Sequence, residues 1–427
     1  MARRLPAADP TPASGLSRRG FLLRGLALGC SAAASPLMTP ITLASVPGET
    51  RLVVIILRGA MDGLDVIRPL GDPDYAALRP GFGQSPGAHA LDNFFALHPD
   101  LGGLMPLWQA GEFGAVHAVS TPYRDRRSHF DGQDLLEAGT GADLPPASRR
   151  DGWLNRALQR MAAAGQSVES RTAFAVGQQA SLILQGSAPA TVWAPGADME
   201  LTPQSRLLLD HLYAADPLFR DAAATATELA AAGLPDPAEL DEDEDEDMAE
   251  GPMMAEPEEA PRPGSPEGVA QYVAEQLHAD TRIASFSLGG WDTHRGQQAN
   301  LRAALRRLEA TLLTLRDSLG PVWGQTAVMA LTEFGRTARE NGTAGTDHGT
   351  GGAMLLAGGA LRGGKVHGLW PGLGDGALYQ QRDLMPTRDV RAHAAWALHG
   401  LMGLSHGDLE NTVFPGLDME NDPGLLA

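Results

Sequence analysis

Six short apolar segments constrain the fold of this chain more than any other feature. They cover residues 52–57, 113–119, 172–176, 283–288, 326–331 and 353–357. Each is too short for a helix, and most end in Gly, Asp or Ser, which is typical of buried strands. Helical patterns lie between several of them, most clearly from Gln297 to Leu319, where leucines recur every three or four residues. This alternation predicts an α/β fold, with a doubly wound, mostly parallel sheet covered by helices on both faces.

The N-terminal residues predict export. Arg18 and Arg19 precede a short stretch rich in Leu, Ala and Gly, and small residues follow up to Ala44. This order is typical of a twin-arginine signal peptide over residues 1–44. A stable span needs about 20 predominantly apolar residues, and Arg24 and the glycines make this stretch too polar. No segment of the mature chain approaches a membrane span. We therefore expect a periplasmic or secreted protein that uses the twin-arginine export machinery. A lipoprotein anchored through Cys30 and a buried N-terminal helix are the alternatives.

The charge distribution limits the partners. The chain has 52 acidic and 33 basic residues and a net charge of −19, which argues against nucleic acid or an anionic lipid surface. Acidic residues are concentrated at 241–247, within a stretch rich in Pro, Met and Glu that extends to 266. We expect 241–266 to be a disordered insertion within a single domain over 45–427, with calcium binding as the alternative role.

Polar residues that suit chemistry stand next to the predicted strands. Ligands of an open parallel sheet bind beyond the carboxyl ends of its strands. Acidic, histidine or serine residues follow four of the predicted strands at this end. Residues of the same kinds also precede the last predicted strand. The candidates, in chain order, are Asp62, Ser128, Asp292, His294, Glu333, Asp347 and His348.

These residue types predict a divalent metal centre. Carboxylates and imidazoles bind zinc, manganese, magnesium or calcium. The six candidates other than Ser128 are enough for two metals, which would clamp a phosphate or sulfate ester. Ser128 is then the expected nucleophile, because the single cysteine, Cys30, lies in the leader. Three arginines close to the candidates are expected to bind the anion: Arg58, Arg127 and Arg336.

Each candidate also has a structural alternative. Asp62 fits an ordinary turn, and Ser128 or the Asp292–His294 segment fits a helix cap. Glu333 fits a buried ion pair with Arg336. The Asp347-His348 pair fits a glycine-rich surface turn.

Taken together, these motifs resemble a secreted bacterial family called domain of unknown function 1501. The resemblance rests on the leader and on five segments: Leu57 to Asp65, Ser128-His129-Phe130, Gly290 to His294, Glu333 to Thr337, and Asp347-His348-Gly349. That family resembles the alkaline phosphatase and sulfatase superfamily, which implies an alkaline-phosphatase-like fold with metal ligands at strand ends. Ser128, followed by His129 and then by Glu137-Ala138-Gly139, is also similar to the nucleophile region of cofactor-independent phosphoglycerate mutases.

The resemblance carries roles to particular residues. It implies that Asp292 and His294 form one ligand pair, that Glu333 replaces an aspartate, and that His348 is the final histidine. Two departures stand out: Asp292 and His294 are two residues apart instead of four, and Phe334 replaces an expected histidine. They imply that one of two metal sites is altered or absent. A sulfatase signature with its formylglycine precursor is missing, which disfavours sulfatase chemistry.

The sequence thus predicts an exported metal-dependent hydrolase or transferase acting on a phosphate or related ester. A non-catalytic, metal-stabilised binding protein of the periplasm or cell envelope is the alternative, and a structural partner of another exported protein is a third reading. Substrate, metal identity and oligomeric state are not specified by the sequence.

Overall fold

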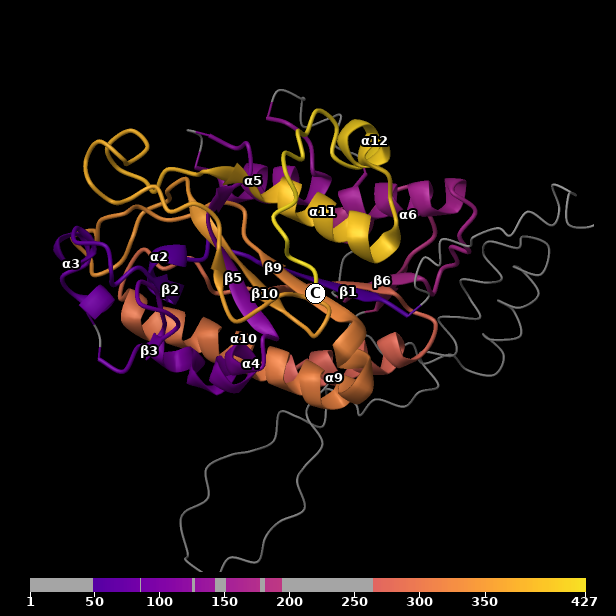
Figure 1. Cartoon of the computed structure of the whole chain (residues 1–427), viewed down its shortest axis with the longest axis horizontal. Helices are drawn as coiled ribbons and strands as arrows, with labels where there is room; N and C mark the ends of the chain where they lie inside the picture. Colours follow the sequence, from indigo (N-terminus) through magenta and orange to yellow (C-terminus); the bar gives the residue numbers. More distant parts are fainter. Residues whose placement is uncertain (1–48, 85, 125–126, 143–150, 177–180, 194–263) are drawn as a thin grey trace, which may run out of the picture. The chain divides into compact units, whose positions relative to one another are not determined.

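Strand β1 (Arg51–Leu57) lies inside a nine-stranded mixed sheet (Figure 1). The computed structural model describes residues 49–84, 86–124, 127–142, 151–176, 181–193 and 264–427. From one edge to the other the strands are β11 (Val366–His367), β5 (Phe113–Ser120), β10 (Gly352–Ala357), β9 (Thr326–Leu331), β1, β8 (Ile283–Leu288), β6 (Ala173–Val176) and β7 (Thr191–Trp193), with β12 (Arg388–Asp389) also paired to β5.

All six strands predicted from the apolar segments are confirmed, and the sheet is mostly parallel. β1 pairs in parallel with β8 and β9, and β6 pairs in parallel with β7 and β8. β10 is antiparallel to both of its neighbours, β5 and β9. The reason lies between Leu331 and Gly352, where the chain forms no crossover helix and therefore returns along the sheet in the opposite direction.

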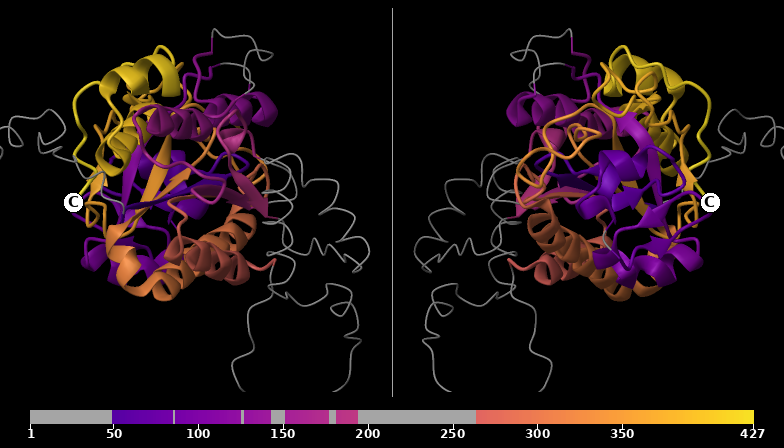
Figure 2. Two further views of the ribbon diagram at one scale, coloured as in Figure 1. Left: turned by 90° about the vertical axis from the view of Figure 1, so that its right-hand side faces the viewer. Right: turned by 90° about the vertical axis from the view of Figure 1, so that its left-hand side faces the viewer.

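Helices cover both faces of the sheet, as the alternation of strands and helices predicts (Figures 1 and 2). One face carries α4 (Met105–Gln109), α9 (Pro266–His278) and α10 (Gln297–Leu319). The other carries α6 (Trp153–Ala163) and α11 (Val390–Met402), with α5 (His129–Ala138) beside them. The observed limits of α10 coincide with the predicted ones. The remaining described elements are short. They are α2 (Gly63–Val66), α3 (Tyr75–Leu78), α12 (His406–Asp408), a π-helical turn (Leu409–Val413), 3₁₀ turns at Phe82–Gln84, Pro99–Leu104, Leu182–Leu184 and Gly320–Gln325, and a small sheet of β2 (Ile67–Arg68), β3 (His89–Ala90) and β4 (Ala96–Leu97).

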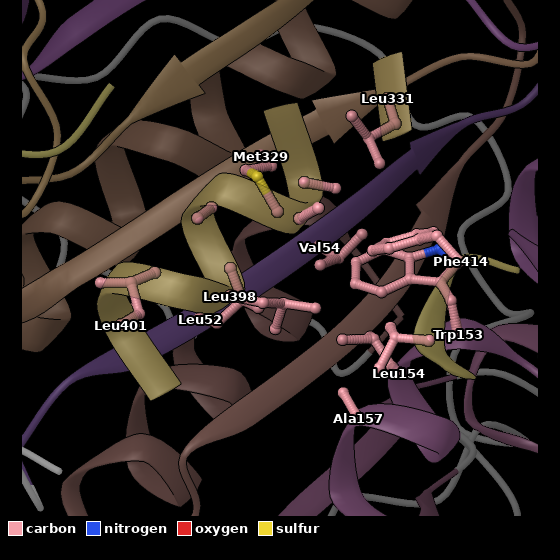
Figure 3. Close-up of a cluster of buried hydrophobic side chains, with 14 of the residues drawn as sticks. Leu52, Val54, Trp153, Leu154, Ala157, Met329, Leu331, Leu398, Leu401 and Phe414 are labelled. Carbon is pink, nitrogen blue, oxygen red and sulfur yellow. The ribbon is translucent and has the colours of Figure 1, made fainter. Parts of the chain in front are cut away.

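Two apolar cores follow from the alternation of side chains along β1. Leu52, Val54 and Ile56 pack toward α6 and α11, whereas their neighbours pack toward α9 and α10. In the first core the rings of Trp153 and Phe414 lie 5.1 Å apart (Figure 3). Full burial of each large apolar side chain stabilises the fold by roughly 1.5–3 kcal/mol. Burial on both faces is the reason that the strand is a continuous apolar run in the sequence.

Residues 49–427 cluster as one unit, and the predicted leader, 1–44, lies outside the described residues. The acidic run also lies outside them up to residue 263. Ser265 and Pro266, at the end of the predicted insertion, cap and begin α9. Among the described residues, no helix combines the length and the apolar character needed to cross a membrane.

We expect the free energy of unfolding to fall as the pH drops from 7 to 5, and His117 to contribute to the fall. This imidazole is buried, and desolvation lowers its pKa to about 4, compared with about 6.5 for an unperturbed histidine. The unfolded chain therefore binds a proton below pH 6.5 that the folded chain takes up only near pH 4. The stability lost at pH 5 is about 2 kcal/mol for this group.

Denaturant titrations at pH 7 and pH 5 measure this contribution. A His117→Gln variant should lose less stability between the two pH values than the parent chain. His278→Gln, at an exposed position on α9, is the matched control and should leave the difference unchanged. An equal pH dependence in the parent and the His117→Gln variant would show that His117 does not contribute.

Candidate metal site

The carboxyl ends of β1, β5, β8 and β9 meet at one edge of the sheet. The register places Leu57 beside Leu288 and Ile56 beside Leu331, so the segments that follow these strands emerge together. β10 runs the other way and begins at this same edge, with Gly352 paired to Val119. The segment before β10 therefore joins the segments that follow the other strands, as the sequence predicts.

Four side chains meet at this edge and are called the histidine cluster here: His129, Asp292, His294 and His348. The Asp292 carboxylate lies among the three Nε2 atoms. Its Oδ2 is 3.4 Å from Nε2 of His129, and its Oδ1 is 3.2 Å from Nε2 of His294 and 3.6 Å from Nε2 of His348. The Nε2 atoms of His294 and His348 are 2.8 Å apart. Ligand atoms of His129, Asp292 and His348 all lie within 4.8 Å of one another.

A separate acceptor holds the Nδ1 atom of each histidine. Glu333 Oε1 lies 2.7 Å from Nδ1 of His129, Asp347 Oδ1 lies 3.3 Å from Nδ1 of His294, and the Arg127 carbonyl oxygen lies 2.9 Å from Nδ1 of His348. A proton on each Nδ1 leaves a lone pair on each Nε2, the arrangement typical of metal-binding histidines and their outer partners.

Burial favours a neutral imidazole at His348, the form that a metal requires. Burial lowers the pKa of His348 to about 4. Nε2 of His129 is buried and has no hydrogen-bond partner among the described residues. A buried nitrogen without a partner is costly, and a metal ion would satisfy it. On this ground the cluster fits a divalent metal.

Glu333 and Asp347 contact the Nδ1 atoms of His129 and His294 and do not belong to the four side chains of the cluster. The Glu333 carboxylate is fully buried and accepts hydrogen bonds from Gly59 N–H, the Gln133 amide and the Thr332 hydroxyl. Burial alone would raise its pKa, but the hydrogen bonds from His129, from the backbone N–H of Glu333 itself and from the Gln133 amide hold the pKa below its ordinary value. Glu333 is thus an ionised partner for His129, and Asp347 has the same relation to His294.

Asp62 is not brought into the cluster. Its carboxylate is fully buried and forms a two-pronged ion pair with Arg79, with Nη1 to Oδ2 at 2.7 Å and Nη2 to Oδ1 at 3.1 Å. Oδ2 also accepts from the Gln297 amide at 2.6 Å, and Oδ1 caps α2 through Leu64 N–H. The oxygens of Asp62 thus accept hydrogen bonds from other parts of the protein. This matches the alternative expectation of a turn residue, and the buried ion pair with Arg79 is an additional feature.

Two of the three arginines expected to bind an anion are bound to the protein instead. The buried guanidinium of Arg336 donates to backbone carbonyls, including those of Gly59 and Ala60, and to Asp292 Oδ1 at 2.6 Å. Arg58 donates to Glu137 Oε1 at 2.5 Å and also bonds to Gln133 and Ser287. Arg127 is exposed beside the cluster.

Close backbone contact at Gly59 keeps Asp292 in place. Gly59 has a φ of +121°, and a Cβ atom there would lie 2.5 Å from the Asp292 nitrogen. A larger residue would displace the backbone of Asp292. Gly59 therefore allows the segments after β1 and β8 to touch.

Ser128 occupies the N-cap of α5, the alternative role considered for it. Its Oγ accepts from Asp131 N–H at 3.4 Å, and its own N–H donates to the Tyr123 hydroxyl at 2.8 Å. This cap makes His129 the first residue of the helix and directs its ring into the cluster. The nucleophilic role of Ser128 stays a prediction.

His129 is the cluster residue that the sequence predictions did not include. Its available signals are its place beside Ser128, directly after the loop that follows β5, and its membership of the Ser128-His129-Phe130 segment that carries the family resemblance. Its imidazole also stacks on Phe334, with ring centroids 5.2 Å apart. Phe334, which takes the place of an expected histidine, thus packs against His129 and supports its ring.

Comparison with known proteins finds one matching sequence family and a set of similar solved structures. The sequence model of a family described as "Protein of unknown function (DUF1501)" matches residues 109–395. No curated protein matches the chain. Among solved structures, a protein in the alkaline phosphatase superfamily from Vibrio parahaemolyticus has 11% identity and a TM-score of 0.34, over 83% of this chain and 67% of that one. The lipoteichoic acid synthase LtaP from Listeria monocytogenes has 9% identity and a TM-score of 0.39, over 89% of this chain and 76% of that one.

Proposed function

This chain belongs to the DUF1501 family of unknown function, and we propose that it is a metal-dependent hydrolase or transferase of phosphate or related esters. One observation carries the proposal. Three imidazoles present Nε2 toward a single carboxylate, and a fixed acceptor holds the Nδ1 atom of each. Such a set of three nitrogens and one carboxylate is typical of a transition-metal site with catalytic potential.

The donor set narrows the metal and its number. Magnesium and calcium prefer oxygen ligands, whereas three imidazoles favour zinc or a neighbouring transition metal. Four clustered ligand side chains suit one ion better than two. The proposed ligands are therefore His129, Asp292, His294 and His348, with Glu333 and Asp347 as their outer partners.

A metal bound there would supply Lewis acidity toward an ester oxygen. The protein supplies the rest of the site. Arg336 fixes Asp292 through a 2.6 Å ion pair, and Glu333 fixes the tautomer of His129. Ser128, the N-cap of α5, precedes His129 directly. We propose that its hydroxyl oxygen attacks the ester phosphorus, that the bond from phosphorus to the alcohol oxygen breaks, and that the serine proton passes to the departing alcohol; water or an acceptor alcohol then takes the phosphoryl group from the serine. The paired arginines in the leader support an exported site of action.

A non-catalytic binding protein is the second candidate. The observation that favours it is the engagement of Arg58 and Arg336 with protein acceptors, which leaves only Arg127 exposed among the three arginines expected to bind an anion. Such a protein would use the same metal cluster to hold an anion without turnover. The following experiment separates the two functions.

We expect the chain from Ser45, purified without chelator, to contain roughly one equivalent of a transition metal by elemental analysis. An Asp292→Ala plus His348→Ala variant should contain none. Ser128→Ala should keep the metal and lose most of its hydrolysis of p-nitrophenyl phosphate or its diester. Metal without turnover in the parent would support the binding protein. Absence of metal, with equal stability of the double variant, would rule out both functions.

A further inference from the structure

Gln297 is a buried amide whose four hydrogen-bonding positions are all used. It is the first residue of α10 and has no exposed surface. Its Nε2 donates to Asp62 Oδ2 at 2.6 Å and to Asp65 Oδ2 at 3.0 Å. Its Oε1 accepts from the hydroxyl groups of Thr293 at 2.9 Å and Thr346 at 2.7 Å.

The partners of Gln297 determine which way its amide points. Carboxylates of Asp62 and Asp65 only accept hydrogen bonds, so the NH₂ group must face them. Arg79 and Arg68 in turn hold these carboxylates at 2.7 Å. The amide oxygen is therefore directed at the two threonines, and the whole group is anchored to a buried ion-pair network that stands apart from the histidine cluster.

The two threonines belong to the two segments that carry metal ligands. Thr293 lies between Asp292 and His294, and Thr346 comes two residues before His348. One amide oxygen thus joins the segment after β8 to the segment before β10. The backbones of these segments also touch, because Thr346 N–H donates to the Thr293 carbonyl at 3.2 Å.

We propose that Gln297 is a positioning residue that fixes the separation of His294 and His348, and with it the affinity and coordination geometry of the metal site. The proposal rests on the proposed metal site, although Gln297 touches none of the four ligand side chains. Outer partners of metal ligands typically change metal affinity by 10–100-fold. Gln297 acts one step further out, on two ligand segments at once.

A double variant, Thr293→Val plus Thr346→Val, removes both hydroxyls from the amide oxygen and preserves side-chain volume. We expect roughly 10-fold or greater loss of zinc affinity in the full chain, measured by competition with a chromophoric chelator. Co²⁺ bound in place of zinc should also show a changed visible absorption spectrum, which a purely structural role would not produce. Thr293→Ser plus Thr346→Ser retains both hydroxyls and should restore the parent affinity and spectrum.

Thr311→Val is the matched control. Thr311 lies on α10 and is fully buried, like Thr293 and Thr346, and its hydroxyl donates to the Arg307 carbonyl at 2.7 Å. It lies about 21 Å along the helix from Gln297, at 1.5 Å per residue. This variant removes a buried hydroxyl that does not contact Gln297, and it should keep the parent zinc affinity.

Three outcomes are decisive. Parent-like zinc affinity and Co²⁺ spectrum in the folded double valine variant would overturn the role of Gln297 and leave the proposed function standing. Failure of the parent chain to bind either metal would overturn the metal site and the role of Gln297 together. If the double variant does not fold, Thr346→Val alone is measured in the same way, and an unchanged affinity there overturns the proposal.

Discussion

A His129→Ala variant should lose metal more completely than any variant of an outer partner. Removal of an outer partner costs roughly 10–100-fold in metal affinity, and His129 is proposed as a direct ligand, so its loss should exceed that range. Its Nε2 is the cluster nitrogen that is buried without a hydrogen-bond partner among the described residues. Zinc competition with a chromophoric chelator measures the affinity, and elemental analysis measures the metal retained after purification.

His278→Ala is the control for His129→Ala. His278 lies at the end of α9, where its Nε2–H donates a hydrogen bond to the Ser318 carbonyl oxygen, 2.9 Å away. Its replacement should leave metal content unchanged. An Asp62→Asn variant should also keep the metal. Retention of metal by His129→Ala, together with its loss from Asp62→Asn, would instead favour the ligand set expected from the sequence.

An Arg79→Ala variant should lower the free energy of unfolding of the metal-free chain by about 3–5 kcal/mol. The variant leaves the Asp62 carboxylate buried without its cationic partner, since Asp62 and Arg79 are both almost completely inaccessible to solvent. Domains are commonly stable by about 5–15 kcal/mol, so this loss would be a large fraction of the total. Chemical denaturation in the presence of chelator measures it.

The double variant Asp62→Ala plus Arg79→Ala tests whether the loss comes from this pair. Residues in direct contact are not additive, and the double variant should lose less stability than the two single variants together. Additive losses would show that the ion pair is not the source. A small loss of stability in Arg79→Ala, accompanied by loss of metal in Asp62→Ala, would indicate that Asp62 is a metal ligand.

The strands and α10 could be predicted because their patterns are local. A strand buried on both faces is a continuous apolar run, and a helix with one buried face repeats its leucines every three or four residues. The antiparallel direction of β10 could not be predicted in this way. It depends on the absence of a crossover helix between Leu331 and Gly352, in a segment whose glycines and polar residues fit several paths.

The location of the histidine cluster could be predicted from the sequence, but not all of the residues that form it. Asp292, His294 and His348 meet where the parallel strands end, as the sequence predicts. Asp62 looks equally suitable in the sequence, because the arginine that binds it comes from a separate segment at Arg79. Glu333 was expected near the metal, and its position behind His129 becomes apparent only when the segments after β5 and β9 are seen together.

The separation of the proposed ligand His129 from its partner Glu333 along the chain has a kinetic consequence. His129 and its partner Glu333 are 204 positions apart, and in the folded chain they follow β5 and β9, which both pair with β10. Contacts of such long range form late, since a large loop must close before they are gained. A metal ion that needs this assembled edge would find no binding site in a partly folded chain. Its binding would therefore slow unfolding of the finished sheet and leave the rate of folding almost unchanged.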